Sequence, residues 1–299
     1  MGNWLTAVSG KNHYRKNFPN KNNIYTITPS WLVKRKQEFV RAIRNLEKLG
    51  FEVINKNFVT RLPSPEEKAQ QIHSAFLNKK VDIILAQRGG YSSIKVLPYL
   101  NFDIIKKNPK IFAGFSDLSA MLNAIYERTG IITLHSPMLI NFAPLRKLTV
   151  ESFLNAINHF PDKNLFSGLN ICVYKHGIEK GILKGGNLIT LTSLLGTQWE
   201  IDTNHTVLFL EEVDEKLHKI DRCITQWILA GKFKKIKGLI LGDFRGIGNR
   251  EIYKILSSQT RINYPVVQCS NIGHVKNKIT LPIGARVELD TYKKSLFIN

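Results

Sequence analysis

The sequence AGFSDLSAM, residues 113–121, sets a serine between two apolar segments of different periodicity. The apolar residues that precede the serine, within 110–114, predict a short buried strand. Those that follow, from Leu118 to Ile125, recur at the spacing of an amphipathic helix. Ser116 is therefore predicted to lie on the turn between a strand and a helix.

Such a turn suits a nucleophile. It lifts a serine hydroxyl above the end of a sheet, where the amide of Asp117 and the N-terminus of the helix can face a developing oxyanion. Gly114 matches the first glycine of the G-x-S-x-G pattern, but Leu118 stands in place of the second. The alternative is that Ser116 or Asp117 only caps the helix.

Two later segments offer the partners that a serine nucleophile needs, a base and a group that orients the base. An apolar strand predicted over 206–210 ends in Glu211 and Glu212, and His274 follows a strand predicted over 264–269. The ends of parallel strands are where sites form in α/β proteins. Because side chains alternate along a strand, the two glutamates point to opposite faces, and only one of them can face His274.

Strands and helices alternate through the first half of the chain. Strands are predicted over 23–29, 51–55, 81–86, 110–114 and 131–134, and helices over 33–49, 64–78 and 149–160. Ser64-Pro65-Glu66-Glu67 forms a capping box with proline at the first helical position. The alternation predicts an α/β protein whose N-terminal domain, residues 1–160, is a doubly wound, Rossmann-like parallel sheet.

The second half of the chain predicts another domain. Residues 161–180 are polar and irregular, which indicates a linker, and residues 181–299 are richer in short strands, which indicates a mixed α/β domain. Ser116 belongs to the first domain, whereas Glu211 and His274 belong to the second. We therefore expect the active site in the cleft between the domains.

Short motifs follow one another along the chain: QRGGY (87–91), GFSD (114–117), HSPM (135–138), GGNL (185–188), LEE (210–212), DR (221–222), and GH (273–274) followed by LPIG (281–284). In order and approximate spacing they resemble the motifs of the LD-carboxypeptidase family of serine peptidases, which also contains the microcin C immunity peptidases. The resemblance extends from about residue 23 to the C-terminus. It departs at Ser92 and Ser136, where the family usually has glycine; both substitutions bear on the shape of the substrate pocket and remove no catalytic group.

The resemblance implies a triad in the chain order Ser, Glu, His. Ser116 would attack the carbonyl carbon, and His274 would take and return the proton. Glu211, with Glu212 as the alternative, would fix the tautomer of the imidazole and stabilise the imidazolium.

Four further residues are assigned to the site. Gly90 and Asp117 would donate backbone amides to the oxyanion, and a glycine suits position 90 because a bare backbone can approach the carbonyl closely. Arg88 offers a rigid fork of donors to a substrate carboxylate, with an internal ion pair as the alternative. Tyr91 is expected to contact the substrate beside it, whereas His135 is expected to be structural.

The activity implied by the resemblance is hydrolysis of an L,D-amide bond, which releases D-alanine from murein tetrapeptides in peptidoglycan recycling, without a metal or organic cofactor. A first alternative is a microcin C-type immunity peptidase that cleaves aminoacyl-nucleotide conjugates. Those relatives tend to have a longer insert with an aromatic residue for stacking the base, and only Trp199 offers itself here. A non-catalytic binder of wall fragments or nucleic acid is the alternative from another class.

Composition limits the partners. The 299 residues include 43 Lys and Arg against 23 Asp and Glu, a net charge of +20 that favours attraction to nucleic acid or anionic surfaces. The cations are scattered, accompany abundant Asn and Ile as in an A+T-rich coding sequence, and form no known nucleic-acid motif. We therefore expect no nucleic acid as a partner, and the resemblance implies a peptide with a D-amino acid terminus.

The compartment is predicted from cysteines and hydropathy. Cys172, Cys223 and Cys269 are odd in number and far apart, so neither structural disulfides nor a zinc site is expected. No run of about 18 apolar residues suggests a membrane partner, and residues 1–15 lack the apolar core of a secretion signal. These features predict a cytoplasmic protein, and the resemblance implies a homodimer.

Overall fold

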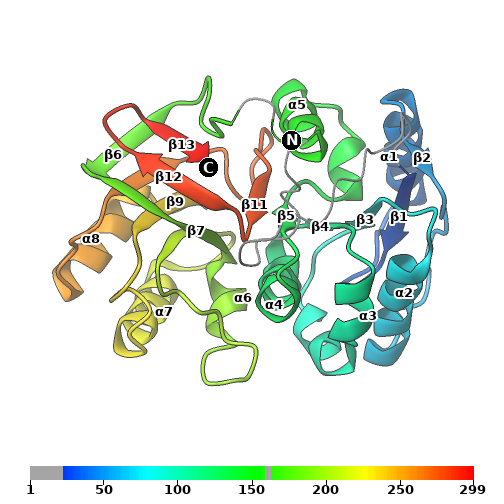
Figure 1. The fold of residues 1–299 in the computed structure, drawn as a ribbon, viewed down its shortest axis with the longest axis horizontal. Coiled ribbons are helices and arrows are strands. Elements are labelled where there is room, and N and C mark those ends of the chain that lie inside the picture. The colour runs from blue at the N-terminus through cyan, green and yellow to red at the C-terminus, as the bar shows by residue number, and fades with distance from the viewer. Residues whose placement is uncertain (1–22, 159, 161–162) are drawn as a thin grey trace.

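The computed structural model describes residues 23–158, 160 and 163–299. The absence of a secretion signal, predicted from residues 1–15, concerns a segment outside the described residues. Figure 1 shows two lobes side by side, with the N-terminal half of the chain on the right and most of the C-terminal half on the left. Within the described residues, no helix combines the length and apolarity needed to cross a lipid bilayer.

The first lobe is built on a six-stranded sheet in the order β11-β5-β4-β3-β1-β2. Its strands are β1 (Asn23–Ile27), β2 (Glu52–Val53), β3 (Ile83–Ala86), β4 (Ile111–Gly114), β5 (Thr133–His135) and β11 (Leu281–Ile283). All pair in parallel except β11, which runs antiparallel to β5. The predicted parallel sheet is therefore confirmed, with one strand added from the far end of the chain.

Helices cover both faces of this sheet. The helices are α1 (Lys36–Lys48), α2 (Pro65–Leu77), α3 (Phe102–Lys107), α4 (Ser119–Thr129) and α5 (Lys147–Ile157), with 3-10 turns η1 (Ser93–Tyr99), η2 (Ser116–Leu118) and η3 (Leu139–Phe142). Ile83 and Leu85 pack with α1 and α5, whereas Ile84 and Ala86 pack with α2, α3 and α4. This burial on both faces explains why the strand is continuously apolar. The predicted capping box at Ser64 is present, and it begins α2.

The second lobe contains a seven-stranded sheet in the order β13-β12-β7-β8-β9-β10-β6. Its strands are β6 (Ile171–Lys175), β7 (Ile178–Asn187), β8 (Thr206–Glu212), β9 (Gly238–Phe244), β10 (Val266–Cys269), β12 (Arg286–Asp290) and β13 (Ser295–Ile298). Strands β7 to β10 are parallel, and the others pair in antiparallel fashion. Helices α6 (Leu188–Thr192), α7 (Leu217–Leu229) and α8 (Asn249–Gln259) pack on one face. The predicted α/β class is confirmed.

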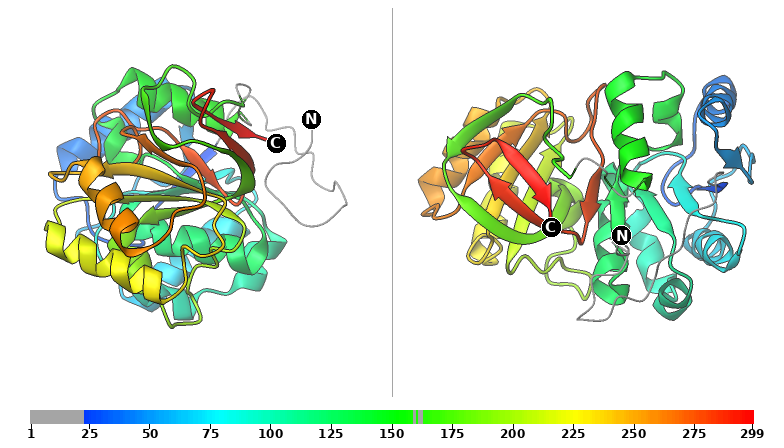
Figure 2. Two further views of the ribbon diagram at one scale, coloured as in Figure 1. Left: turned by 90° about the vertical axis from the view of Figure 1, so that its left-hand side faces the viewer. Right: turned by 45° about the horizontal axis from the view of Figure 1, so that its top comes forward.

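Two segments differ from the predicted organisation. Part of the predicted linker, 161–180, is the edge strand β6, which pairs with β10 almost a hundred residues later in the chain. Strand β11 belongs by sequence to the predicted second domain but completes the sheet of the first, and Figure 2 (right) shows it between the lobes. Both strands are short, and their hydrogen-bonded partners lie far away in sequence. The local sequence pattern therefore did not indicate to which sheet each strand belongs.

Helix α4 joins the lobes. The Asn123 side chain donates to the carbonyl of Gly185 at 2.9 Å, and the Asn187 amide donates to Ser119 Oγ at 2.9 Å. Lys184 forms an ion pair with Glu127 at 2.7 Å. Because β7 is paired with β8, these contacts hold the start of α4 close to the end of β8.

Candidate active site

Ser116 lies on the turn between β4 and α4, as predicted. Its φ of +66° is a left-handed conformation that few non-glycine residues adopt, and such strain is common where a side chain must be presented in one direction. Neither Ser116 nor Asp117 caps α4, because the capping position is Leu118 and no side chain bonds there. The capping alternative is therefore not what the structure shows.

A chain of hydrogen bonds joins three residues that are far apart in sequence. Ser116 Oγ lies 2.8 Å from His274 Nε2, and His274 Nδ1 lies 2.7 Å from Glu211 Oε2. Glu211 is fully buried at the end of β8, whereas 18% of the His274 side chain is exposed. Because a carboxylate only accepts, Nδ1 donates to it, which leaves Nε2 free to accept the proton of the serine hydroxyl.

Glu212 points away from this chain of bonds. Its carboxylate accepts from Asn187 Nδ2 and from the amides of Ile189 and Val213, each at 2.8 Å. Burial raises the pKa of Glu212, and these three hydrogen bonds oppose that shift. Of the two predicted acids, the structure brings Glu211 to His274 and places Glu212 at the start of α6.

Asp117 anchors the turn that carries the serine. Its buried carboxylate accepts from the Ser30 hydroxyl and, at 2.8 Å, from the Ser93 amide, and Ser93 Oγ donates to the Asp117 carbonyl at 2.5 Å. The buried ammonium of Lys68 donates to the carbonyl of Ser30 at 2.8 Å. The side chain of Asp117 thus ties the turn to η1 and to Ser30 after β1, and Lys68 of α2 bonds in turn to Ser30.

Gly90 lines the cleft beside the serine, and its neighbours also leave no room for a side chain. A Cβ at this position would lie 2.6 Å from both Ser30 Oγ and Trp31 Cβ. The neighbouring Gly89, which sequence reasoning did not single out, is also close, since a Cβ there would lie 3.1 Å from Ser116 Cβ. In the sequence, the glycine pair of the QRGGY motif is the feature that indicates this tight packing.

Arg88 and Tyr91 have different surroundings. Arg88 lines the cleft, and its Nη1 donates to the Leu32 carbonyl at 2.9 Å. Tyr91 is 62% exposed, packs on Trp31 at 4.9 Å between ring centroids, and is not among the described residues that line the cleft. The structure therefore does not bring Tyr91 to the nucleophile.

The cleft has a volume of about 600 Å³ and receives residues from both lobes. Five cationic side chains line it: Arg88, Arg146, Arg245, Lys276 and Lys278. Glu38 and Asp214 supply acids. The excess of positive charge favours an anionic ligand. In the sequence, Lys276 and Lys278 belong only to a short basic run, 276–278.

His135 lies beneath the site as a packing residue. Its ring is 5.8 Å from that of Phe115 and 5.0 Å from that of Phe209, both edge to face. Burial lowers the pKa of His135 to about 4, so the ring is neutral at physiological pH. In the part of the chain that the structure describes, no three His, Cys, Asp or Glu residues gather as a metal site would require.

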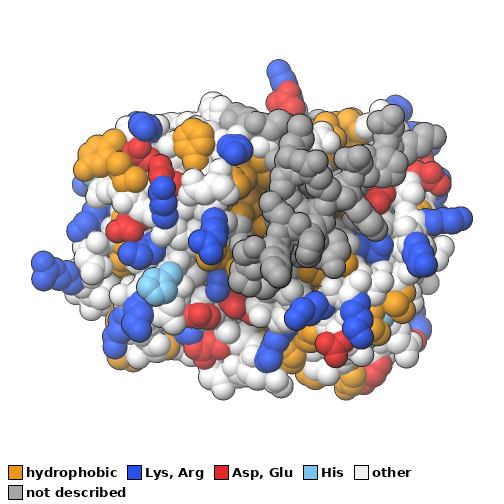
Figure 3. Space-filling view, viewed as in Figure 1, with side chains coloured by type: hydrophobic (Ala, Val, Ile, Leu, Met, Phe, Trp, Pro, Cys, Tyr) orange, Lys and Arg blue, Asp and Glu red, His pale blue; other side chains and the backbone are white. Residues whose placement is uncertain are grey.

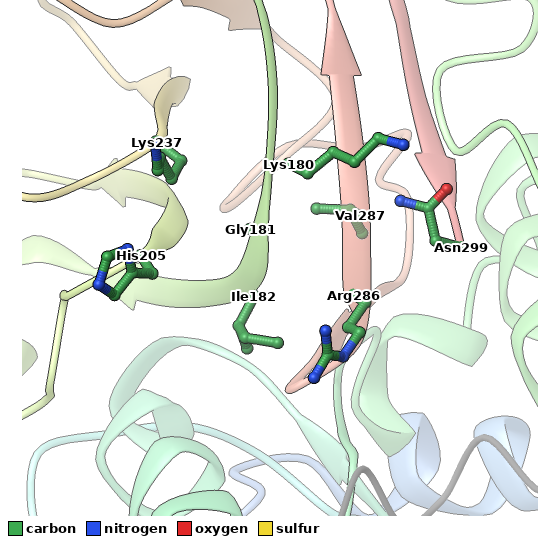
Figure 4. Close-up of a pocket in the computed structure, with 8 residues that line it drawn as sticks. All are labelled: Lys180, Gly181, Ile182, His205, Lys237, Arg286, Val287 and Asn299. Carbon is green, nitrogen blue, oxygen red and sulfur yellow. The ribbon is translucent and has the colours of Figure 1, made fainter. Parts of the chain in front are cut away.

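A second cavity, of about 550 Å³, is lined by residues of the paired strands β7 and β12 and by His205, Lys237 and Asn299, and it does not include the Ser116 turn (Figure 4). Its basic residues are partly neutralised, because Lys180 pairs with Glu288 at 3.0 Å and Lys237 with Glu179 at 3.3 Å. On the face shown in Figure 3, Lys and Arg side chains are scattered among acidic and uncharged ones.

The departures at Ser92 and Ser136 leave the lining of the cleft unchanged. Ser92 Oγ accepts from Lys68 Nζ at 2.8 Å and donates to the Ser30 carbonyl at 2.9 Å, and Ser136 Oγ donates to the Pro137 carbonyl at 3.2 Å. Both side chains are buried, and neither is among the described residues that line the cleft.

We expect Ser92→Gly to lower the free energy of unfolding by about 1–3 kcal/mol, because the Lys68 ammonium loses a buried acceptor. Urea denaturation measures this loss, and kcat/KM of the folded variant should remain near that of wild type. A large loss of activity with unchanged stability would instead place Ser92 at the substrate.

Gly273 precedes the catalytic histidine candidate in a left-handed conformation with φ of +107°. A Cβ at this position would lie 2.6 Å from Glu211 Oε2, the atom that accepts from His274. Gly273→Ala is therefore expected to displace the carboxylate and lower kcat by about 10²-fold or more. Gly246→Ala is a suitable control, since Gly246 also has a positive φ but nothing within 4 Å of an added Cβ. Equal turnover in the two variants would contradict the expectation.

Comparisons with known proteins agree with the geometry. The family model of the LD-carboxypeptidase N-terminal domain matches residues 24–136, and that of the C-terminal domain matches residues 180–289. The chain is 32% identical over 274 residues to the probable murein peptide carboxypeptidase of Bacillus subtilis (strain 168), covering 86% of this chain and 85% of that protein. It is 29% identical over 308 residues to the microcin C7 self-immunity protein MccF of Escherichia coli, covering 89% of each.

Solved structures show the same likeness over nearly the whole chain. An MccF-like protein from Bacillus anthracis str. Ames superposes with a TM-score of 0.84 at 27% identity, covering 94% of this chain and 97% of that one. The muramoyltetrapeptide carboxypeptidase from Oxalobacter formigenes superposes with a TM-score of 0.77 at 29% identity, covering 92% and 97%. The chain therefore belongs to the LD-carboxypeptidase family of serine peptidases.

Proposed function

We propose that the protein is an LD-carboxypeptidase that releases the terminal D-alanine of murein tetrapeptides, a step of peptidoglycan recycling. The observation that carries the proposal is the hydrogen-bonded chain from Ser116 through His274 to Glu211 at a cationic cleft. A peptide that ends in a carboxylate complements that charge. The names of the Bacillus subtilis and Oxalobacter formigenes relatives support the same substrate class.

The geometry suggests a mechanism of acyl transfer. As Ser116 Oγ attacks the carbonyl carbon of the scissile amide, His274 Nε2 takes the hydroxyl proton, and Glu211 stabilises the imidazolium through Nδ1–H. The amides of Gly90 and Asp117 are the proposed donors to the oxyanion. His274 then passes its proton to the leaving amine of D-alanine, and water hydrolyses the acyl-enzyme by the same route in reverse.

The aromatic residue considered for stacking a nucleobase lies elsewhere. Trp199 packs against Phe102, with 5.5 Å between ring centroids, and the Arg128 guanidinium lies 5.0 Å above its ring. Trp199 is not among the described residues of the cleft. This placement favours a peptide over an aminoacyl-nucleotide conjugate.

A direct competition of substrates tests the proposal. The purified protein is incubated with a murein tetrapeptide, with the same peptide ending in L-alanine, and with an aminoacyl-sulfamoyl adenosine. We expect release of D-alanine from the first and slow or absent cleavage of the other two. Preferential consumption of the nucleotide conjugate would support the immunity-type activity, and equal cleavage of the two peptides would indicate a general carboxypeptidase.

A further inference from the structure

Lys278 is the least exposed of the five cationic side chains that line the cleft, with 6% of the residue accessible. Its ammonium lies 4.4 Å from the centroid of the Phe115 ring, and Phe115 directly precedes the nucleophile. Among the described residues, Lys278 Nζ has no hydrogen-bond or ion-pair partner. The side chain is buried but its ammonium opens onto the cleft, and a cation with so little access to water and no partner favours an anion there.

Three of the other cations of the cleft are less suited to this role, whereas Arg146, half-buried just before α5, adds its charge to that of Lys278. The Arg88 guanidinium donates to the Leu32 carbonyl, and the Arg245 guanidinium donates to the carbonyl of His274. Lys276 is exposed, so water solvates its ammonium. Lys278 thus combines a cleft position with unused donors.

We propose that Lys278 binds the terminal carboxylate of the substrate and so makes the cleft selective for peptides with a free C-terminus. This inference rests on the proposed function. In the substrate, the carbon of the terminal carboxylate is three covalent bonds from the carbonyl carbon that Ser116 attacks. In the protein, Phe115 adjoins Ser116 in the chain, and its ring faces the Lys278 ammonium, so the nucleophile and the ammonium both lie beside this one residue. A substrate carboxylate would accept a charge-assisted hydrogen bond from the Lys278 ammonium, which otherwise has no acceptor among the described residues.

The charges around Lys278 set the pH range of this binding. Burial lowers the pKa of Lys278 to about 8, Glu211 opposes the shift, and Arg245 and Arg146 increase it. His135 also lies within electrostatic range of Lys278, but it is neutral at pH 7 because its pKa is lowered to about 4. Lys278 is therefore a cation at pH 7 and loses its charge above about pH 8, so kcat/KM for a free-acid peptide should fall there, because kcat/KM reports groups of the free enzyme.

The test compares two substrates, a murein tetrapeptide and the same peptide with a C-terminal carboxamide. Wild type should prefer the acid by about 10- to 100-fold in kcat/KM, the range expected of one hydrogen bond to a charged group. Lys278→Met should abolish this preference, and Lys278→Arg should retain most of it and keep it above pH 8, since Arg stays charged. Lys276→Met is the matched control, because it removes the same charge from the same cleft and should leave the preference unchanged.

Other results would overturn the inference. Equal cleavage of acid and amide by wild type would show that the carboxylate is not recognised. If Lys278→Met lowered kcat/KM equally for both peptides, Lys278 would act as a counter-charge for Glu211. If Lys276→Met reduced the preference for the acid as much as Lys278→Met does, the preference would come from the overall positive charge of the cleft. Dissociation constants of both peptides, measured in a Ser116→Ala background, provide the same comparison without turnover. If wild type neither cleaves nor binds either peptide, the proposed function itself fails, and this inference with it.

Discussion

Ser116→Ala is expected to lower kcat/KM for the tetrapeptide by about 10³-fold or more, because the residues of a triad act as a unit. The remaining imidazole and carboxylate have no nucleophile to activate, and the turn is held by Asp117 rather than by the serine hydroxyl. The variant should therefore unfold at nearly the same urea concentration as wild type. Rates of D-alanine release measure the loss.

Ser193→Ala is the control for this prediction, since Ser193 is exposed and its hydroxyl bonds only to the Thr190 carbonyl among the described residues. It should have wild-type turnover. Near-normal activity of Ser116→Ala would exclude the acyl-transfer mechanism, and a collapse of both variants would indicate a general effect on the fold.

Glu211→Gln is expected to lower kcat by about 10³- to 10⁴-fold, as for the corresponding acid of other triads. A neutral amide cannot stabilise the imidazolium, and its NH₂ group facing His274 Nδ1 would favour the wrong tautomer. Gly273 packs close against this side chain, since a Cβ built on the glycine would lie 2.6 Å from Glu211 Oε2. The pH dependence of kcat, measured with the tetrapeptide, reports how the loss of the carboxylate alters protonation of the His274 imidazole.

Glu212→Gln provides the matched comparison, since it makes the same change one residue away. The new NH₂ group would face a backbone N–H, that of Ile189 or Val213, so we expect a loss of stability of about 1–3 kcal/mol with turnover close to wild type. A reversal of the two phenotypes would assign the orienting role to Glu212. Equal losses of turnover would mean that the carboxylates act through local structure.

Local sequence determined the environment of the nucleophile. Apolar periodicity switches from that of a strand to that of a helix around Ser116, and the capping box at Ser64 encodes the start of α2 within four residues. Side-chain alternation along β8 also required that Glu211 and Glu212 separate. These features depend on neighbours in the chain, so they are visible without the fold.

Motif order carried the assignment of the triad, whereas only the tertiary structure decided which groups meet. That Glu211 and not Glu212 reaches His274 depends on which face of β8 lies against the turn after β10. That the pair reaches Ser116 depends on how α4 holds the first lobe against β7. The place of β6 and of β11 depends on partners far along the chain. Lys278 belongs to a basic run in the sequence, and its burial against Phe115 arises because segments far apart in the chain meet at the cleft. Burial and long-range pairing are set by packing between distant segments, which no local pattern records.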